Sequence, residues 1–203
     1  MKEEGAKAGA SNRLVLKDFI SIAVFKVIYI VATFIIGMPL AFLVLVTYLM
    51  YPFVTAIFTG VIGMFFLAKV QKPFALFIFI VLSGAIMTIM GHTIIVFLHS
   101  LIVGILAEVT RKALGYKTLK GNIACYSVLS LDLVGSFWEI FLMKEQYYNM
   151  MTQSVGKVRA DQAMALPMWI MAILYASCIV GAIMGGFLGA KILKKHFVKA
   201  GIV

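Results

Sequence analysis

The stretch LAFLVLVTYLMYPFVTAIFTGVIGMFFLA, residues 40–68, decides the fold, because its interpretation sets the number of membrane crossings. One α-helix over all of it would be about 43 Å long, whereas the hydrocarbon core of a bilayer is about 30 Å thick. Two crossings would need about 40 apolar residues. Pro52 removes a backbone donor, so we predict a break there and one crossing over residues 52–68. The chain before Pro52 is expected to lie at the outer surface or to pack over the bundle.

Five further apolar spans flank this stretch. Each approaches or exceeds the length of about 20 residues that a crossing helix needs. They cover residues 14–37, 74–90, 93–113, 123–143 and 166–193. The sequence therefore predicts an all-α integral membrane protein with six transmembrane helices in a single domain, residues 1–203.

The charge pattern predicts the orientation. The chain is 63% hydrophobic and 13% charged, with a net charge of +10. Most of its 18 lysines and arginines lie in segments that face the cytoplasm if both termini are inside. Basic residues between apolar spans are typical of cytoplasmic loops, so we expect no nucleic-acid partner. The expected topology is N-in and C-in, in the cell membrane.

The segment KEQYYNMMTQSVGKVRADQAMA, residues 144–165, is the longest predicted loop and lies on the outer side. Loops of this length are uncommon unless they have a function. We predict a lid over an outward-facing site, with Tyr147 among the residues that contact substrate. A solvated linker with an amphipathic turn is the alternative.

Ionisable residues within membrane spans usually face the protein interior or a cavity. His92 and His99 are seven residues apart, as are Asp132 and Glu139 on the following span. Seven residues of α-helix return to nearly the same face, so the two pairs are expected to interleave in the outer half of the bundle. Lys26 falls at the depth of Asp132, and we predict a buried structural ion pair between them.

The remaining polar residues form a candidate substrate site. Interhelical hydrogen bonding is the alternative for each of them. The predicted substrate contacts are His92, His99, Trp138, Glu139 and Tyr147. Two imidazoles and a carboxylate suit a divalent metal, a heterocycle, or axial ligation of haem iron by His92 or His99.

Catalysis and ATP hydrolysis have little support in the sequence. The chain has no HExxH, GxSxG or GxxxxGK[ST] motif, so we expect no enzyme activity. A membrane enzyme or a channel that uses the stripe of His92, His99 and Glu139 remains the alternative. Gly181, Gly185 and Gly189 form a small-residue stripe for close packing, either within the bundle or against another membrane subunit.

Several strings, in this order, resemble a known family. They are YPFVTAIFTGVIGMFFLAKVQK (51–72), Gly91-His92, AEVTRKALGYKT (107–118) and KKHFVKAGI (194–202). The chain resembles the substrate-binding S components of energy-coupling factor (ECF) transporters, specifically the Trep_Strep group, and the resemblance implies their helical bundle.

This resemblance implies a bacterial importer that captures a micronutrient at the outer face. Its partners would be a transmembrane T subunit and two ABC ATPases that supply ATP hydrolysis. It implies no intrinsic cofactor and no metal site, with haem or a vitamin-like molecule as the transported ligand. Docking to the T subunit would use small residues on the first helix. Ala23 fits this pattern, whereas Val27 stands where a second small residue is expected.

Overall fold

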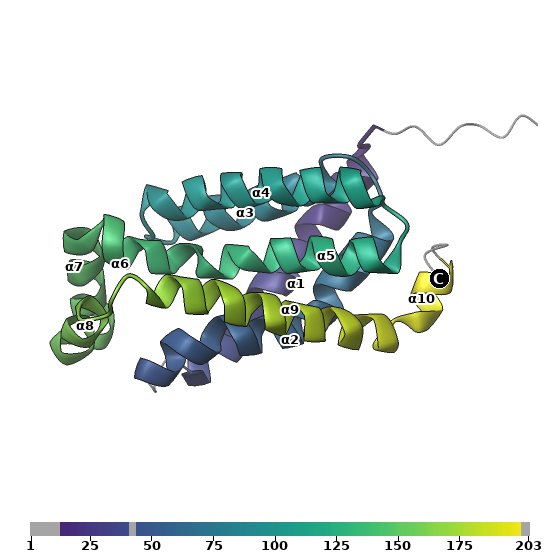
Figure 1. Ribbon diagram of the computed structural model, residues 1–203. Coiled ribbons are helices and arrows are strands. Elements are labelled where there is room, and N and C mark those ends of the chain that lie inside the picture. Colours follow the sequence, from purple (N-terminus) through teal and green to yellow (C-terminus); the bar gives the residue numbers. More distant parts are fainter. Residues whose placement is uncertain (1–12, 41–43, 200–203) are drawn as a thin grey trace, which may run out of the picture.

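The computed structural model describes residues 13–40 and 44–199, and only the backbone of residues 44–49, 196 and 197. Across these residues the secondary structure is helical. The long helices lie side by side as a bundle, and shorter helices lie at its two ends (Figure 1). The elements are α1 (Leu16–Leu40), α2 (Val44–Lys69), α3 (Ala75–Ile89), α4 (Ile94–Leu114), α5 (Leu119–Ser130), the 3₁₀ helix η1 (Leu131–Trp138), α6 (Glu139–Leu142), α7 (Lys144–Val155), α8 (Lys157–Met164), α9 (Ile170–Ile192) and α10 (Lys194–Lys199).

Five helical segments within the described residues are long and apolar enough to cross a membrane. They are α1, α2 from Met50, α4, the combined α5–η1–α6 segment and α9. The predicted helix over residues 74–90 is present as α3, but it has 15 residues, or about 22 Å, and is too short to count as a sixth span on its own. The all-helical membrane class is confirmed, and a sixth crossing stays a prediction.

The predicted break at Pro52 is wrong. Helix α2 begins at Val44 and continues through Pro52 to Lys69. A proline interrupts one backbone hydrogen bond, and a membrane helix tolerates it where neighbouring helices hold both halves. Pro52 is buried, and α2 packs against α9, so the bundle supports the helix at this position. Part of the segment that we expected at the outer surface, residues 41–43, lies outside the described residues.

The predicted helix over residues 123–143 changes type along its length. An α-helical half, α5, gives way to a 3₁₀ helix, η1, before a short α6. A 3₁₀ helix has three residues per turn and rises about 2.0 Å per residue. The Sγ of Cys178 donates to the Ser130 carbonyl oxygen at 3.0 Å, at the junction, and so occupies an acceptor that a continuing α-helix would use. The α-helical spacing that we applied to Asp132 and Glu139 therefore does not hold.

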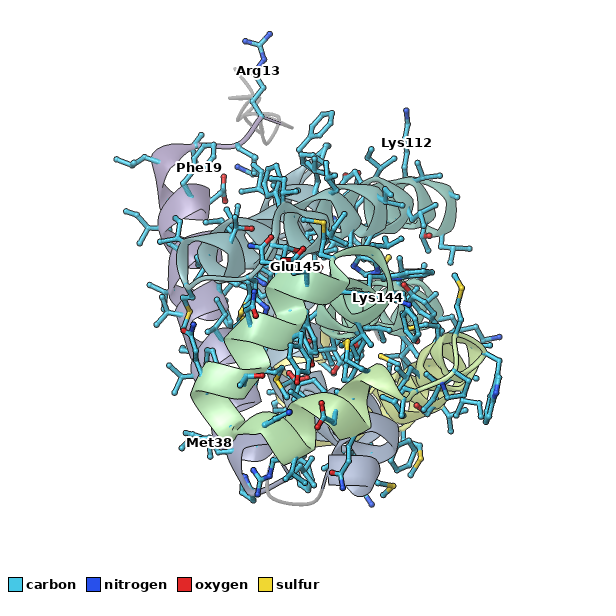
Figure 2. All side chains as sticks on the ribbon, turned by 90° about the vertical axis from the view of Figure 1, so that its left-hand side faces the viewer. Arg13, Phe19, Met38, Lys112, Lys144 and Glu145 are labelled. Atoms are coloured by element: carbon cyan, nitrogen blue, oxygen red, sulfur yellow. The ribbon has the colours of Figure 1, made fainter. Side chains whose placement is uncertain are left out.

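Residues 144–164 are helical rather than a loop. Gly156, with φ of 92°, lies between α7 and α8 and allows the sharp turn that joins them. The two helices lie across one end of the bundle, and Figure 2 looks directly at them, with Lys144 and Glu145 facing the viewer. Whether they act as a lid over a bound substrate stays a prediction.

The opposite end of the bundle is basic. Helices α2, α4 and α9 run toward it, and each has basic residues in its last turn. These residues are Lys69, Arg111, Lys112 and Lys191. The start of α1 and the helix α10 lie at the same end (Figure 1). By the positive-inside rule this arrangement supports a cytoplasmic location for that end, and hence an outer location for α7 and α8.

Candidate functional site

A cavity of about 210 Å³ lies within the bundle, between α1, α2, α3, α4 and the α5–η1 segment. Its walls combine apolar side chains with an unusual number of polar ones. The polar lining residues are Lys26, Tyr29, Thr33, Tyr51, Ser83, His92, Ser100, Asp132 and Ser136. Polar and charged groups inside a membrane bundle are costly and typically mark a functional site. This cavity is therefore our candidate site.

Helix α1 forms one wall of the cavity. Lys26, Tyr29 and Thr33 are spaced i, i+3 and i+7, which places them on one face, and all three are buried. The hydroxyl of Thr33 donates to the Tyr29 carbonyl oxygen at 2.8 Å. The Tyr29 hydroxyl accepts from Thr59 Oγ1 at 3.3 Å, and the Thr59 Oγ1 also lies 3.0 Å from the Tyr126 hydroxyl. These hydrogen bonds connect α1 to α2 and α5.

The ammonium group of Lys26 lies in this wall with only 2% of the residue exposed. Its Nζ donates to the Ser83 Oγ of α3 at 2.5 Å. The same nitrogen lies 4.0 Å from the centroid of the Phe79 ring and 5.1 Å from that of Tyr29. A cation over an aromatic face is attracted by the ring electrons. One neutral hydroxyl and two ring faces thus hold the ammonium group.

Asp132 lies in the wall that η1 contributes. Its Oδ1 accepts a hydrogen bond from Ser100 Oγ at 2.5 Å and lies 4.0 Å from His99 Nδ1. Among the ion pairs of the described residues, Asp132 is matched with His99 and not with Lys26. No contact within 4.0 Å joins Lys26 to Asp132, although the two charges interact across the cavity, so a structural ion pair between them stays a prediction. Serine hydroxyls on two different helices satisfy the two charged groups separately, and both groups line the same cavity.

His92 and Glu139 form a second polar contact, at the end of the bundle near α7. Helix α4 begins at Ile94, after a turn in which Gly91 has φ of 107°, so His92 precedes the helix. Its Nδ1 lies 2.9 Å from Glu139 Oε2, and the Thr93 backbone N–H donates to Glu139 Oε1 at 2.5 Å. Glu139 is fully buried. Its carboxylate at the N-terminus of α4 satisfies a free backbone N–H and opposes the positive end of the helix dipole.

His99 belongs to a third cluster, with Trp138 and Tyr175. The Nε2 of His99 lies 2.7 Å from the Tyr175 hydroxyl, and the Trp138 Nε1 donates to that hydroxyl at 2.7 Å. With its oxygen accepting from Trp138, the hydroxyl can donate to His99 Nε2. A neutral His99 then carries its proton on Nδ1, toward Asp132, an assignment that follows from the hydrogen-bond network.

The predicted substrate residues are thus divided among different places. His92 lines the cavity, whereas His99, Trp138, Glu139 and Tyr147 are not among its lining residues. The expectation that histidines and carboxylates interleave is confirmed, because His92 is next to Glu139 and His99 is next to Asp132. The expectation of a single helical stripe of two histidines is wrong, because His92 lies outside α4. A substrate contact for each of these residues stays a prediction.

The geometry offers little support for metal or haem ligation. Within the described residues, no group of three or more His, Cys, Asp or Glu side chains is placed to hold a metal ion. One ring nitrogen of His92 and one of His99 are already in hydrogen bonds. The cavity is also smaller than the roughly 300–1,000 Å³ that is usual for drug-sized ligands.

The comparison with protein families decides the relationship of this chain. Residues 16–199 match the model of a family described as hypothetical bacterial integral membrane protein (Trep_Strep). The chain belongs to the Trep_Strep family. The match runs from α1 to α10 and therefore covers the whole bundle. No curated protein and no solved structure matches the chain. The predicted location, a multi-pass protein of a bacterial membrane, is confirmed.

This Trep_Strep protein has cavity residues that the sequence analysis missed. They are Tyr29, Thr33, Tyr51, Ser83, Ser100 and Ser136. For α1 the signal was present, since Lys26, Tyr29 and Thr33 are polar at helical spacing in an otherwise apolar span. The serines gave no comparable signal, because single serines are common in membrane helices as small packing residues.

Ala23 and Val27, the predicted docking residues, both lie on the exposed face of α1 in this Trep_Strep protein. Val27 is 59% exposed, and the neighbouring Val24 is 52% exposed. In a membrane such a face contacts lipid or another membrane protein. A docking role for this face stays a prediction.

Proposed function

We propose that this Trep_Strep protein is the substrate-binding S component of an ECF-type importer and that the cavity holds the substrate. The observation that carries the proposal is the pair of charged residues, Lys26 and Asp132, in one cavity of a bundle surrounded by lipid. Purely structural charges in a membrane protein are expected to pair directly with each other. Here they face a shared space, which suits a bound polar molecule.

The position of the cavity supports capture from outside. Met87 and His92 line it, and both are close to the turn between α3 and α4, at the end that α7 and α8 cover. That end is opposite the basic one, so the positive-inside rule assigns it to the outer face. Substrate would enter from this end, and movement of α7 and α8 would control access.

The remaining parts of the proposal come from the resemblance. A T subunit and two ABC ATPases would supply the driving force, because the chain contains no P-loop motif. We propose no enzymatic step and no intrinsic cofactor for this chain. The exposed face of α1 with Ala23 and Val27 would be the docking surface for the T subunit.

Cargo smaller than haem suits the cavity better. A volume of about 210 Å³ lies below the roughly 300–1,000 Å³ usual for drug-sized ligands, and a porphyrin ring needs more space. Haem is therefore not the expected cargo, and finding it bound would change our assignment of the site.

The experiment uses the full chain, purified in mild detergent from a bacterial host grown with and without haem. The protein is denatured, and the released small molecules are identified by mass spectrometry together with the absorbance spectrum of the intact protein. We expect a colourless protein that releases one polar molecule, and we expect Lys26→Met and Asp132→Asn to lose it. Lys112→Met, which alters an exposed lysine in the last turn of α4, is the matched control.

A second measurement tests the partners. A tagged chain at native expression level should co-purify with a membrane subunit and two ATPases, and this recovery should fall when Ala23 is replaced by a large side chain. A chain that binds no small molecule and recovers no ATPase would refute the proposal. A Soret band lost in His92→Ala or His99→Ala would make haem the cargo and show that the cavity opens far beyond this conformation.

A further inference from the structure

The charges of the cavity define a class of ligand. Among its lining residues Lys26 is the one lysine or arginine and Asp132 is the one carboxylate, so the two charges balance. They come from different walls, α1 and η1, and no ion pair joins them. The space between the walls is therefore positive on one side and negative on the other.

Each charged group has hydrogen-bonding capacity left over. An ammonium group has three N–H donors, and one of those of Lys26 is directed to Ser83 Oγ. A carboxylate has two oxygens with about four acceptor sites, and Ser100 occupies one site on Oδ1 of Asp132. A ligand can thus accept hydrogen bonds from Lys26 and donate hydrogen bonds to Asp132 without displacing either serine.

The cost of burial favours a ligand that meets both charges. A neutral hydroxyl and two ring faces hold Lys26. Asp132 accepts a hydrogen bond from Ser100 and has His99 Nδ1 at 4.0 Å. A ligand with only one charge would form a charge-assisted hydrogen bond at one wall and leave the group on the other wall with its present partners alone. A ligand with a carboxylate and a protonated amine gives each of the two charged residues an oppositely charged partner and adds no net charge to the bundle. Besides its hydroxyl groups and His92, the lining has apolar side chains, including Ile30, Ile80 and Leu133, which suit a short hydrocarbon segment between the two groups.

We infer that the cavity binds a small zwitterion, with its carboxylate toward Lys26 and its protonated amine toward Asp132. The cavity of about 210 Å³ is smaller than the roughly 300–1,000 Å³ usual for drug-sized ligands and suits a ligand of about the size of an amino acid. The inference rests on the proposed function, because it names the substrate class of the same site. No covalent step is involved.

The test uses a graded series of probes on the purified full chain. The probes are the unbranched ω-amino acids from glycine to 6-aminohexanoate, and the matched probes with a single charge are pentanoate and pentylamine. Binding is measured by titration calorimetry and by the rise in the unfolding midpoint. We expect at least one ω-amino acid to bind at least tenfold more tightly than either singly charged probe. Lys26→Met and Asp132→Asn should each lower that affinity at least tenfold, and Lys112→Met, at the opposite end of the bundle, should leave it unchanged.

A parallel measurement separates this inference from the proposed function. The protein is dialysed against a protein-free metabolite extract of bacterial cells, and the retained molecules are identified by mass spectrometry. A retained zwitterion supports the inference even if every ω-amino acid is the wrong length. A retained molecule without both charged groups, or probe binding that survives Asp132→Asn, overturns the zwitterion class and leaves the binding function intact. Retention of no molecule, with no probe bound, overturns both.

Discussion

Two regions of the same bundle pack in different ways. One is the contact between α2 and α9, and the other is the region beside α1 that contains the cavity. In the first, glycines on both helices bring the backbones together. A Cβ on Gly60 would overlap the Gly185 backbone, and one on Gly181 would overlap the Phe53 backbone. In the second, the long side chains of Lys26 and Tyr29 lie between α1 and its neighbours, and a cavity remains. We call the α2–α9 contact the glycine seam.

Helix α2, which packs closely through its glycines, is more buried than α1. Over their most apolar windows, 50% of α2 residues are buried, against 22% of α1 residues. Exposed apolar side chains of α1, such as Phe19 and Met38, point outward in Figure 2. Small residues at a membrane interface stabilise by close van der Waals contact and leave no room for a ligand. Space for a ligand is found where polar side chains separate the helices, so the α1 side is where binding and movement are expected.

We expect the largest loss of stability from a substitution that disrupts the glycine seam. Gly185→Leu places a side chain against the Ala56 carbonyl oxygen and within 2.9 Å of the Ile57 Cα, where backbone cannot move aside. We expect a loss of about 3 kcal/mol or more, because overpacking costs 1–3 kcal/mol even where side chains can adjust. Size-exclusion chromatography and thermal unfolding in detergent would show aggregated protein. Ala176→Leu, on the exposed face of α9, should remain folded. A well-folded Gly185→Leu variant would contradict the seam.

The next effect concerns Glu139, which holds the start of α4 from outside the helix. Glu139→Ala removes the acceptor of Thr93 N–H and the partner of His92. A buried donor left without a partner costs about 1–3 kcal/mol, so the unfolding midpoint should fall clearly. The exposed Glu145→Ala is the control and should leave it nearly unchanged. An equal midpoint for both variants would show that Glu139 is not structural, and its place as a substrate contact would then gain weight.

Lys26→Met tests the difference between the glycine seam and the cavity beside α1, because it should abolish ligand binding while it leaves the stability of the protein nearly unchanged. Lys26→Met removes the cost of burying a charge together with the hydrogen bond to Ser83 and the ring contacts, so we expect a change in unfolding free energy within about 1 kcal/mol. Ligand binding should be lost. A variant that unfolds as readily as Gly185→Leu would mean that Lys26 supports the fold, and the functional assignment of the cavity would fail.

The smallest effect lies at the end of the bundle that α7 and α8 cover. The Tyr148 hydroxyl donates to Asp161 Oδ1 at 2.9 Å, and this hydrogen bond raises the pKa of Tyr148 above its ordinary value. A tyrosine with a raised pKa stabilises the folded state below its ordinary pKa of about 10, and that contribution is lost as the pH rises further. Tyr148→Phe should therefore lower the unfolding midpoint at neutral pH, but by less than Gly185→Leu or Glu139→Ala, because the hydrogen bond is exposed. The main effect of Tyr148→Phe should be faster amide hydrogen exchange in α8, measured by mass spectrometry.

Sequence reasoning recovered the features that depend on local apolar length. The membrane class, the positions of most helices and the basic end all follow from runs of apolar residues and from the lysines and arginines between them. It also predicted that the histidines and carboxylates lie at similar depths, and in the structure His92 is next to Glu139 and His99 is next to Asp132. It failed at Pro52, where packing against α9 supports a helix that local propensity would break, and at η1, where a hydrogen bond from Cys178 accompanies the change of helix type.

By itself, the sequence determined that this protein lies in a membrane, which segments are apolar enough to cross it, and which few ionisable residues are placed inside. The tertiary structure alone decided which partner each of those residues has. Lys26 and Asp132 were expected to meet, but each forms a hydrogen bond with a serine, from α3 and α4 respectively, on different walls of one cavity. The physical reason is that burial follows from local hydrophobicity, whereas a hydrogen bond depends on which distant segment arrives within about 3 Å.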